Sequence, residues 1–211
     1  MTEAEAQSRV AKLVSRETLQ QFGQIEIALK QWSKRFNLVA PASLAAFWAR
    51  HVLDSVQLLA LAPKTATNWM DLGSGAGFPG MILACQLAER PDAKMLLVEA
   101  NGKKASFLQH CARITGAPVT VLQQRIEQIP QLTPAQKPDV ITARALADLS
   151  TLLGFCQPLV HAKTVLLLPK GQNVTEELTL ARKQWKLELR VAPSLTSDSA
   201  SVLRIGAFSR V

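Results

Sequence analysis

The stretch from Trp69 to Gly80, W-M-D-L-G-S-G-A-G-F-P-G, constrains the fold of this chain more than any other segment. A short apolar run leads into alternating glycines, and the residues that follow have the composition of a helix over 79–90. Glycines permit positive φ angles and let a ligand come close to the backbone. A strand, a glycine turn and a helix in this order predict an open α/β sheet that binds a nucleotide-like ligand at the carboxyl ends of its strands.

Two classes of ligand compete for this glycine loop. Gly75, Gly77 and Gly80 match G-x-G-x-x-G, so a dinucleotide is one alternative. Asp71 argues against it, because a carboxylate repels pyrophosphate but attracts the ammonium group that S-adenosylmethionine carries. Pro79 also removes one N–H group that a phosphate would use. We therefore favour S-adenosylmethionine as the cofactor over a dinucleotide, and over a turn that binds nothing.

Length, hydropathy and cysteine usage limit the class of protein. A chain of 211 residues suits one domain with a small extension. No apolar run approaches the ~20 residues that span a membrane, and the acidic, polar first residues do not resemble a secretory signal. The three cysteines lie far apart without a C-x-x-C pair, and no His, Cys or carboxylate cluster indicates a metal. We expect a cytoplasmic protein with reduced thiols and without a metal site.

The charge of the chain is positive and unevenly distributed. The net charge is +8, yet acidic residues outnumber basic ones over 65–100, whereas basic residues prevail over 101–170. This distribution favours a cationic small molecule bound beside a polyanion such as nucleic acid. Charge alone does not separate that interpretation from an ordinary solvated surface.

The order of the expected elements predicts the fold class. Residues 2–36 and 42–62 have helical periodicity, with a break near Ser15, and strands then alternate with helices. Strands are expected at 68–72, 94–99, 118–122, 138–142, 164–168, 187–191 and 201–208, and helices near 79–90, 101–115, 145–161 and 173–185. This pattern predicts an α/β fold with a doubly wound, mainly parallel seven-stranded sheet that ends in an antiparallel hairpin, an ending that fits a methyltransferase sheet better than a dinucleotide domain. We expect an N-terminal helical cap over 1–62 and a methyltransferase domain over 68–211.

Polar residues at the ends of the second and third expected strands are candidates for contacts with the cofactor. Glu99 ends the second strand, where an acid accepts hydrogen bonds from ribose hydroxyls; the alternative is a cap for the next helix. Ile126 and Glu127 follow the third strand, where the adenine would lie. Glu127 has the alternative of being a solvated charge.

Arg144 closes the fourth expected strand, which faces the group to be transferred. The Asn/Asp-Pro-Pro-aromatic motif of amine methylation is absent there, and Cys156 lacks the preceding proline of a thiolate nucleophile. What remains suits a nucleophile that needs no deprotonation, such as guanine N7. Arg144 would then hold guanine O6. The alternative is an ion pair with Asp148 one turn further along a helix.

Further cations lie where they would contact RNA. Lys170 ends the fifth strand and Arg125 leaves the third, and with Lys103 and Lys104 they would surround the pocket with phosphate-binding charge. Each of them taken singly fits a solvated surface residue equally well. In the helical cap, R-H-x-x-D places Arg50, His51 and Asp54 together, with His51 and Asp54 on one helix face. A histidine beside an acid is also a common structural hydrogen bond.

These segments together resemble the RsmG (glucose-inhibited division protein B) family. The resemblance rests on W-S-K-R-F-N-L at 32–38, R-H-V-L-D-S at 50–55, D-L-G-S-G-A-G-F-P-G at 71–80, K-K-A-S-F-L at 103–108, R-I-E at 125–127, A-R-A-L-A-D-L at 143–149 and P-K-G at 169–171. It implies methylation of N7 of guanine 527 in 16S ribosomal RNA of the small subunit, with S-adenosylmethionine as cofactor. It further implies a class I methyltransferase (Rossmann-like) fold with an N-terminal helical cap, and cofactor contacts at Gly73, Phe78, Ile126, Glu127 and Arg144.

The sequence departs from the family at Glu99-Ala100-Asn101, where many members have Asp-Ser, and after Gly171, where nothing is carried across. The candidate site residues fall into three groups. The catalytic candidates are Arg144, Arg125 and Lys170; the cofactor candidates are Asp71, Gly73, Gly75, Gly77, Phe78, Glu99, Ile126, Glu127 and Arg144; the RNA candidates are Arg50, His51, Lys103, Lys104, Arg125 and Lys170.

Two other functions remain open at the level of sequence. One is a methyltransferase for a small molecule or a protein, and the other is a non-catalytic RNA-binding module on the same fold. The sequence also leaves open whether the substrate is naked RNA or an assembled particle. We expect a monomer, although the sequence does not determine the oligomeric state.

Overall fold

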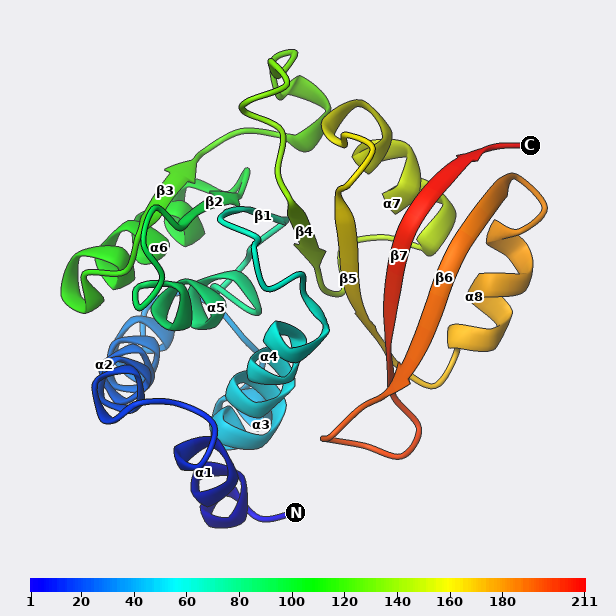
Figure 1. Cartoon of the computed structure of the whole chain (residues 1–211). Helices are drawn as coiled ribbons and strands as arrows, with labels where there is room; N and C mark the ends of the chain where they lie inside the picture. Colours follow the sequence, from blue (N-terminus) through cyan, green and yellow to red (C-terminus); the bar gives the residue numbers. More distant parts are fainter.

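A single seven-stranded sheet organises the chain in the computed structural model, which describes residues 1–211. The strands lie in the order β3-β2-β1-β4-β5-β7-β6 (Figure 1). β7 runs antiparallel to both β5 and β6, and the other pairs are parallel. The strands are β1 (Asn68–Leu72), β2 (Lys94–Val98), β3 (Val119–Leu122), β4 (Val140–Ala143), β5 (Val165–Lys170), β6 (Trp185–Pro193) and β7 (Ser201–Arg210).

Alternate residues of the strands separate two hydrophobic cores, one on each face of the sheet. Successive side chains of a strand point to opposite faces, so Trp69 packs on one face and Met70 on the other. The first face is covered by α5 (Gly80–Leu87) and α6 (Gly102–Thr115). The second is covered by α7 (Leu149–Cys156), the short 3-10 helix η4 (Gln157–Leu159) and α8 (Val174–Ala181). The sheet is therefore doubly wound, and the expected class I methyltransferase fold with its C-terminal antiparallel hairpin is confirmed.

The N-terminal helices pack onto the first face. They comprise α1 (Glu3–Ala11), α2 (Arg16–Ser33), α3 (Pro41–Ala45), the π-helix η1 (Phe47–Leu53), α4 (Asp54–Val56) and the 3-10 helix η2 (Gln57–Leu61). Ser15 accepts a hydrogen bond from the backbone of Thr18 and starts α2, which explains the break expected near that residue. Phe22, Ile25 and Leu29 of α2 belong to the same core cluster as α5 and α6. The division into a cap over 1–62 and a domain over 68–211 stays a prediction.

The expected strands are confirmed within a few residues at each end, but three expected helices are shorter: α5 ends at Leu87 and not near 90, α8 ends at Ala181 and not near 185, and α7 starts late. α7 begins at Leu149 and not at 145, because Ala145 has a positive φ of 52° and Asp148 accepts a hydrogen bond from Thr151 as the N-cap. Residues 144–148 therefore form a loop at the carboxyl end of β4. This loop leaves Arg144 free to point away from the helix.

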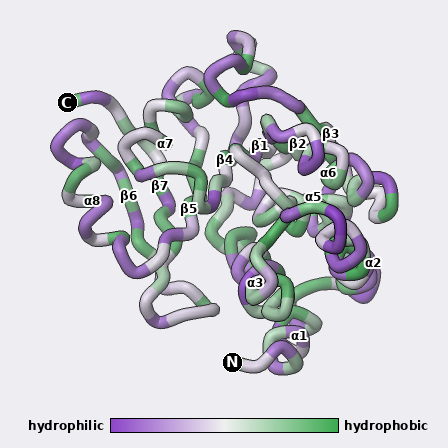
Figure 2. Tube along the Cα trace, turned by 180° about the vertical axis from the view of Figure 1, so that it is seen from behind, coloured by the Kyte–Doolittle hydropathy of each residue, from purple (hydrophilic) through white to green (hydrophobic).

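Hydropathy follows the layers of the fold. In Figure 2 the central strands are largely hydrophobic, whereas the long connection between β3 and β4 is mostly hydrophilic. None of the helices combines the length and the apolar character that crossing a membrane requires.

Candidate functional site

The glycine loop between β1 and α5 opens at Gly75. Gly75 has a φ of 57°, and a Cβ atom there would have no neighbour nearer than 3.8 Å. The backbone is therefore exposed to a ligand at this point. Gly80 is required for the opposite reason, since a Cβ atom would lie 2.6 Å from the Cβ of Asp71. The start of α5 thus packs directly on the side chain of Asp71, a role for Gly80 that the motif alone did not reveal.

Asp71 lies beneath the glycine loop, against the backbone of Gly80. Its side chain is 0 % exposed, and its Oδ1 accepts a hydrogen bond of 2.6 Å from the hydroxyl of Thr142 on β4. Burial raises the pKa of Asp71 to about 6, against the opposing effect of the Thr142 hydroxyl. Contact between this carboxylate and the ammonium group of the cofactor stays a prediction.

Glu99 is held at the end of β2 by the glycine loop itself. One carboxylate oxygen accepts a hydrogen bond of 2.7 Å from the backbone of Gly75, and the other accepts one of 2.7 Å from the backbone of Asn101. The helix N-cap is Asn101, whose side chain accepts from the backbone of Lys103 and Lys104. The carboxylate therefore shapes the loop and orders the entry into α6. Contact with ribose hydroxyls stays a prediction.

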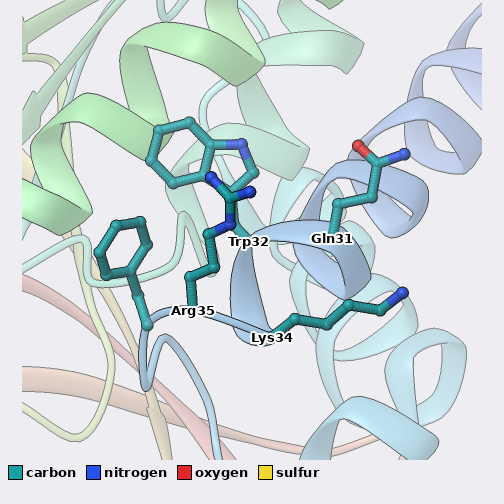
Figure 3. A pocket seen from close by; sticks show the side chains of 5 residues that line it. Gln31, Trp32, Lys34 and Arg35 are labelled. Carbon is teal, nitrogen blue, oxygen red and sulfur yellow. The ribbon is translucent and has the colours of Figure 1, made fainter.

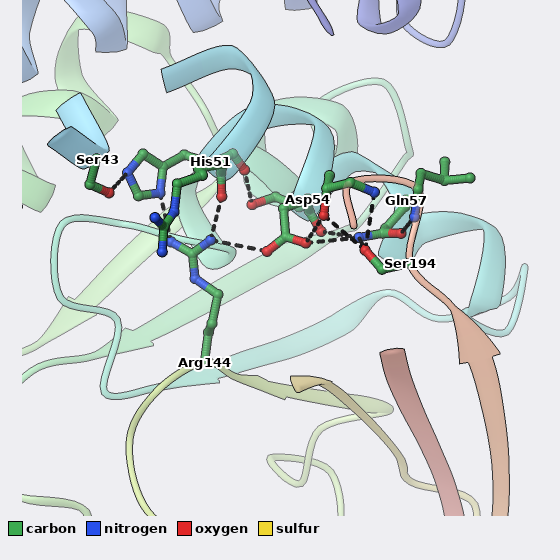
Figure 4. Close-up of polar contacts among 10 residues, drawn as sticks. Ser43, His51, Asp54, Gln57, Arg144 and Ser194 are labelled. Carbon is green, nitrogen blue, oxygen red and sulfur yellow. Dashed lines mark hydrogen bonds and ion pairs between the residues drawn. The ribbon is translucent and has the colours of Figure 1, made fainter. Parts of the chain in front are cut away.

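Arg144 connects the end of β4 to the N-terminal helices. Its guanidinium donates hydrogen bonds to the carbonyl oxygen of Arg50 (2.8 Å), to Asp54 Oδ2 (3.1 Å) and to His51 Nδ1 (2.8 Å), as Figure 4 shows. The expected alternative, an ion pair with Asp148, is wrong, because the helix that would have aligned the two residues starts later. Three of the five N–H groups of Arg144 have protein acceptors, so two remain for a substrate.

His51 is neutral and has a defined tautomer. Arginine only donates hydrogen bonds, so Nδ1 accepts from Arg144 and Nε2–H donates to the Ser43 hydroxyl at 2.7 Å. The ring stacks on Phe78 of the glycine loop, with centroids 4.2 Å apart and planes within 14°. Burial and the nearby charge of Arg144 lower the pKa of His51 to about 3. His51 contacts Arg144 and not Asp54, although the spacing placed the histidine and the acid on one face.

A second layer of hydrogen bonds ties Asp54 to the loop between β6 and β7. Thr196 donates to Asp54 Oδ1 at 3.1 Å, and the side-chain amide of Gln57 donates to the same oxygen at 3.0 Å. Gln57 in turn accepts from the backbone of Leu195 at 2.8 Å (Figure 4). Arg144 is thus held directly by residues 50–54 and indirectly, through Asp54, by the β6–β7 loop, two segments that lie far from it in the sequence.

Part of the expected site residues line one cavity of about 680 Å³. Arg50, His51, Arg144 and Lys170 come together there, beside the β6–β7 loop. The ammonium group of Lys170 is 2.6 Å from Glu177, so its charge is already paired. The structure does not bring Arg125, Lys103 or Lys104 to this cavity. Their roles as catalytic or RNA-binding residues stay predictions.

Ile126 and Glu127 line a different cavity, of about 560 Å³, beside α7. Ile129, Phe155, Pro158 and Leu159 give it an apolar wall. An apolar wall next to the end of β3 is compatible with a flat aromatic ring such as adenine, and the two residues keep their expected role as a prediction.

The residues of this sheet edge fit a cofactor with a cationic and a ribosyl part. Asp71 Oδ2 is a buried oxygen without a hydrogen-bond partner under the loop, and the carboxylate of Glu99 lies at the next strand end. Both are negative, and the loop above them exposes its backbone at Gly75. Such an arrangement suits S-adenosylmethionine better than a pyrophosphate, which needs positive potential.

Comparison with known proteins identifies the family. Residues 16–202 match the family model described as GidB, rRNA small subunit methyltransferase G. The chain belongs to this family. A ribosomal RNA small subunit methyltransferase G from Parvibaculum lavamentivorans is 46% identical over 192 residues, which cover 91% of this chain and 84% of the relative. A protein of the same name from Methylorubrum extorquens is 44% identical over 94% of this chain and 92% of its own length.

Solved structures that resemble this member of the rRNA small subunit methyltransferase G family share its fold. A SAM dependent methyltransferase from Aquifex aeolicus superposes with a TM-score of 0.59 at 16% identity, over 84% of this chain and 98% of that chain. A TehB-like SAM-dependent methyltransferase from Corynebacterium glutamicum gives 0.57 at 15% identity, over 87% and 97%. At such identities the likeness concerns the fold alone.

Sequence reasoning missed several residues that complete the site. Thr142, Ser43, Gln57 and Thr196 each donate or accept a hydrogen bond that positions a candidate residue. Thr142 lies directly opposite Asp71 in the register of β1 and β4, so only the pairing of these two strands reveals its role. The others come from segments whose proximity depends on the tertiary fold.

Proposed function

We propose that this chain transfers the methyl group of S-adenosylmethionine to N7 of a guanine in 16S ribosomal RNA, at guanine 527 as the family resemblance implies. Family membership supports small-subunit ribosomal RNA as the substrate, and the fold supports the cofactor. The observation that carries the proposal is the position of Arg144. This residue follows β4, lines the cavity, and is held by Asp54, while two of its N–H groups have no acceptor in the protein.

Specific residues would hold the two reactants. The glycine loop with Asp71 and Phe78, together with Glu99, Ile126 and Glu127, would bind the cofactor, which supplies a methyl group on a positively charged sulfur. Arg144 would present its two remaining N–H groups to guanine O6, the usual base-edge partner of arginine. Because its three other N–H groups are held, the guanidinium needs little reorganisation to align the base.

The side chains that line the cavity favour a nucleophilic atom that needs no deprotonation. Both ring nitrogens of His51 and both carboxylate oxygens of Asp54 are engaged in hydrogen bonds, and Glu177 pairs with Lys170. Burial raises the pKa of Cys156 to about 12, so this thiol stays protonated. Guanine N7 has a lone pair in the ring plane, and its alkylation requires alignment and electrostatic stabilisation without a general base.

Mapping N7-methylguanine in 16S ribosomal RNA tests this function. A deletion strain is complemented with the wild type, with Arg144→Lys, or with Arg190→Lys as an exposed control. We expect one N7-methylguanine to disappear on deletion and to return with the wild type and the control. Lysine keeps the charge but loses the fork of donors, so Arg144→Lys should slow methylation by roughly 10²-fold or more. Unchanged N7-methylguanine in the deletion strain would refute the proposal.

The setting of this activity forms part of the proposal. We infer that the chain acts in the cytoplasm as a monomer, with residues 1–62 serving as a helical cap that positions Arg144. Tritium from labelled cofactor should appear in RNA. Its appearance in a protein or a small molecule, or the absence of cofactor binding in calorimetry, would point to the other functions that the sequence left open.

A further inference from the structure

The end of α2 and the start of α6 form a surface that combines cations with aromatic rings. We call it the α2–α6 patch and define it by Trp32, Lys34, Arg35, Phe36, Lys103 and Lys104. Two cavities, of about 500 Å³ and about 330 Å³, lie within it and share Arg35 and Phe36. In Figure 3 the side chain of Arg35 extends toward the indole of Trp32.

The cations of the patch have no acidic partner within the protein. Lys34, Arg35, Lys103 and Lys104 make no side-chain hydrogen bond or ion pair, in contrast to Arg144 and Lys170. No acidic residue lines either cavity. Four unpaired positive charges at one place create a potential that attracts phosphate groups.

The patch contains a tryptophan that is partly exposed to solvent. Trp32 is half-buried, whereas Trp48, Trp69 and Trp185 are buried. Three rings lie beside Trp32, with centroids 5.6 Å away for Phe107, 5.6 Å for His110 and 5.8 Å for Phe36. Packing therefore covers only part of the indole. The Lys103 ammonium sits 5.3 Å from the centre of the Phe36 ring, which brings the charges and the rings together.

The patch lies next to the candidate cofactor site. Asn101, which lines the smaller cavity, accepts hydrogen bonds from the first residues of α6 and itself donates its backbone N–H to Glu99. Glu99 in turn binds the glycine loop at Gly75. A chain of direct contacts thus connects the patch to the glycine loop, so the two sites are neighbours on the protein.

We propose that the α2–α6 patch binds a single-stranded segment of the substrate RNA beside the guanine to be methylated. An unpaired base would stack on Trp32, and the backbone phosphates would pair with the four cations. This combination of aromatic rings and cations is how proteins bind unpaired nucleotides. The proposal rests on the proposed function for the identity of the RNA, but its binding chemistry stands by itself.

The first test removes the charges. In one variant Lys34, Arg35, Lys103 and Lys104 become alanine; in the control, the exposed Arg182, Lys183, Lys186 and Arg190, at the end of α8 and on β6, become alanine. Binding of a short oligoadenylate is measured as a function of salt. Removing one phosphate-binding cation should lower the slope of log K against log salt by about 0.7, so the slope for the patch variant should fall by up to about 3 and that for the control by almost nothing. Equal slopes for the two variants would refute the proposal.

The second test uses the fluorescence of Trp32. Oligoadenylate should quench the tryptophan emission of the wild type, and Trp32→Phe should abolish the quenching, because the other three tryptophans are buried. Phenylalanine retains an aromatic contact with Phe107, so the variant should keep its fold. Undiminished quenching in Trp32→Phe would show that the base stacks elsewhere.

Methylation assays separate this proposal from the proposed function. With the patch variant we expect unchanged affinity for S-adenosylmethionine and an unchanged kcat on 16S ribosomal RNA, with KM raised about 10-fold or more. If the wild type binds oligoadenylate at the patch but does not methylate ribosomal RNA, the proposed function is refuted and the proposal that the patch binds RNA is kept. A patch variant with the wild-type KM would overturn the RNA surface alone.

Discussion

Burial raises the pKa of Asp71 and lowers that of His51, so the two residues make opposite contributions to the pH dependence of stability. Replacing one of them makes the contribution of the other measurable. Burial raises the pKa of Asp71 from 3.8 to about 6, so between these values the folded protein binds the extra proton and rising pH destabilises it. The pKa of His51 falls from 6.5 to about 3, so over the same range the unfolded chain binds the extra proton and rising pH stabilises the fold. In the wild type the two contributions offset each other between about pH 4 and 6.

Replacing Asp71 with asparagine should make the contribution of His51 visible. Each titrating group contributes about 1.4 kcal/mol per pH unit. The free energy of unfolding of Asp71→Asn, minus that of the wild type, should therefore rise with pH by about 2 kcal/mol between about pH 4 and 6, since each pKa lies near one end of this range. His51→Asn, whose amide oxygen still accepts from Arg144, should show a difference that falls with pH at a similar rate.

Urea unfolding at several pH values, followed by far-ultraviolet circular dichroism, measures both differences. Asp198→Asn, which changes an exposed aspartate in the β6–β7 loop, should follow the wild type throughout. A difference for Asp71→Asn that stays flat, or that changes in the same direction as that of His51→Asn, would show that burial does not govern these two groups.

Three further changes test the site. Glu99→Gln should weaken binding of S-adenosylmethionine by roughly 10-fold to 100-fold in calorimetry, because a carboxylate forms stronger hydrogen bonds than an amide. An unaltered affinity would show that Glu99 does not contact the cofactor. Gly80→Ala should destabilise the fold by about 1–3 kcal/mol in urea unfolding, because its methyl group would meet Asp71, and a stability equal to the wild type would contradict that contact. Thr196→Val should lower the rate of RNA methylation by roughly 10-fold without changing cofactor affinity, because Asp54 loses a donor and holds Arg144 less firmly; restoration of the rate by Thr196→Ser would confirm that the hydroxyl is responsible.

Most secondary structure of this chain follows from patterns that lie close together in the sequence. The strand at 68–72, its glycine turn and the alternation of strands and helices after it are local signals, and the structure confirms each of them. Helix starts depend on capping as well as on composition, as α7 shows. An apolar segment after Arg144 suggested a helix from 145, but the side chain of Asp148 caps the helix one turn later.

The candidate site depends on both the sequence and the tertiary structure. Sequence alone determined the doubly wound fold, the glycine loop and the placement of Glu99 and Arg144 at strand ends, because periodicity and turn chemistry act over a few residues. Only the tertiary structure decided that Arg144 pairs with Asp54, 90 residues away, that Asp71 is buried beneath the loop, and that Trp32 is only half-buried beside a cavity. Burial and long-range pairing arise from how layers pack against each other, and no local pattern encodes the distance between two segments that meet only in the folded chain.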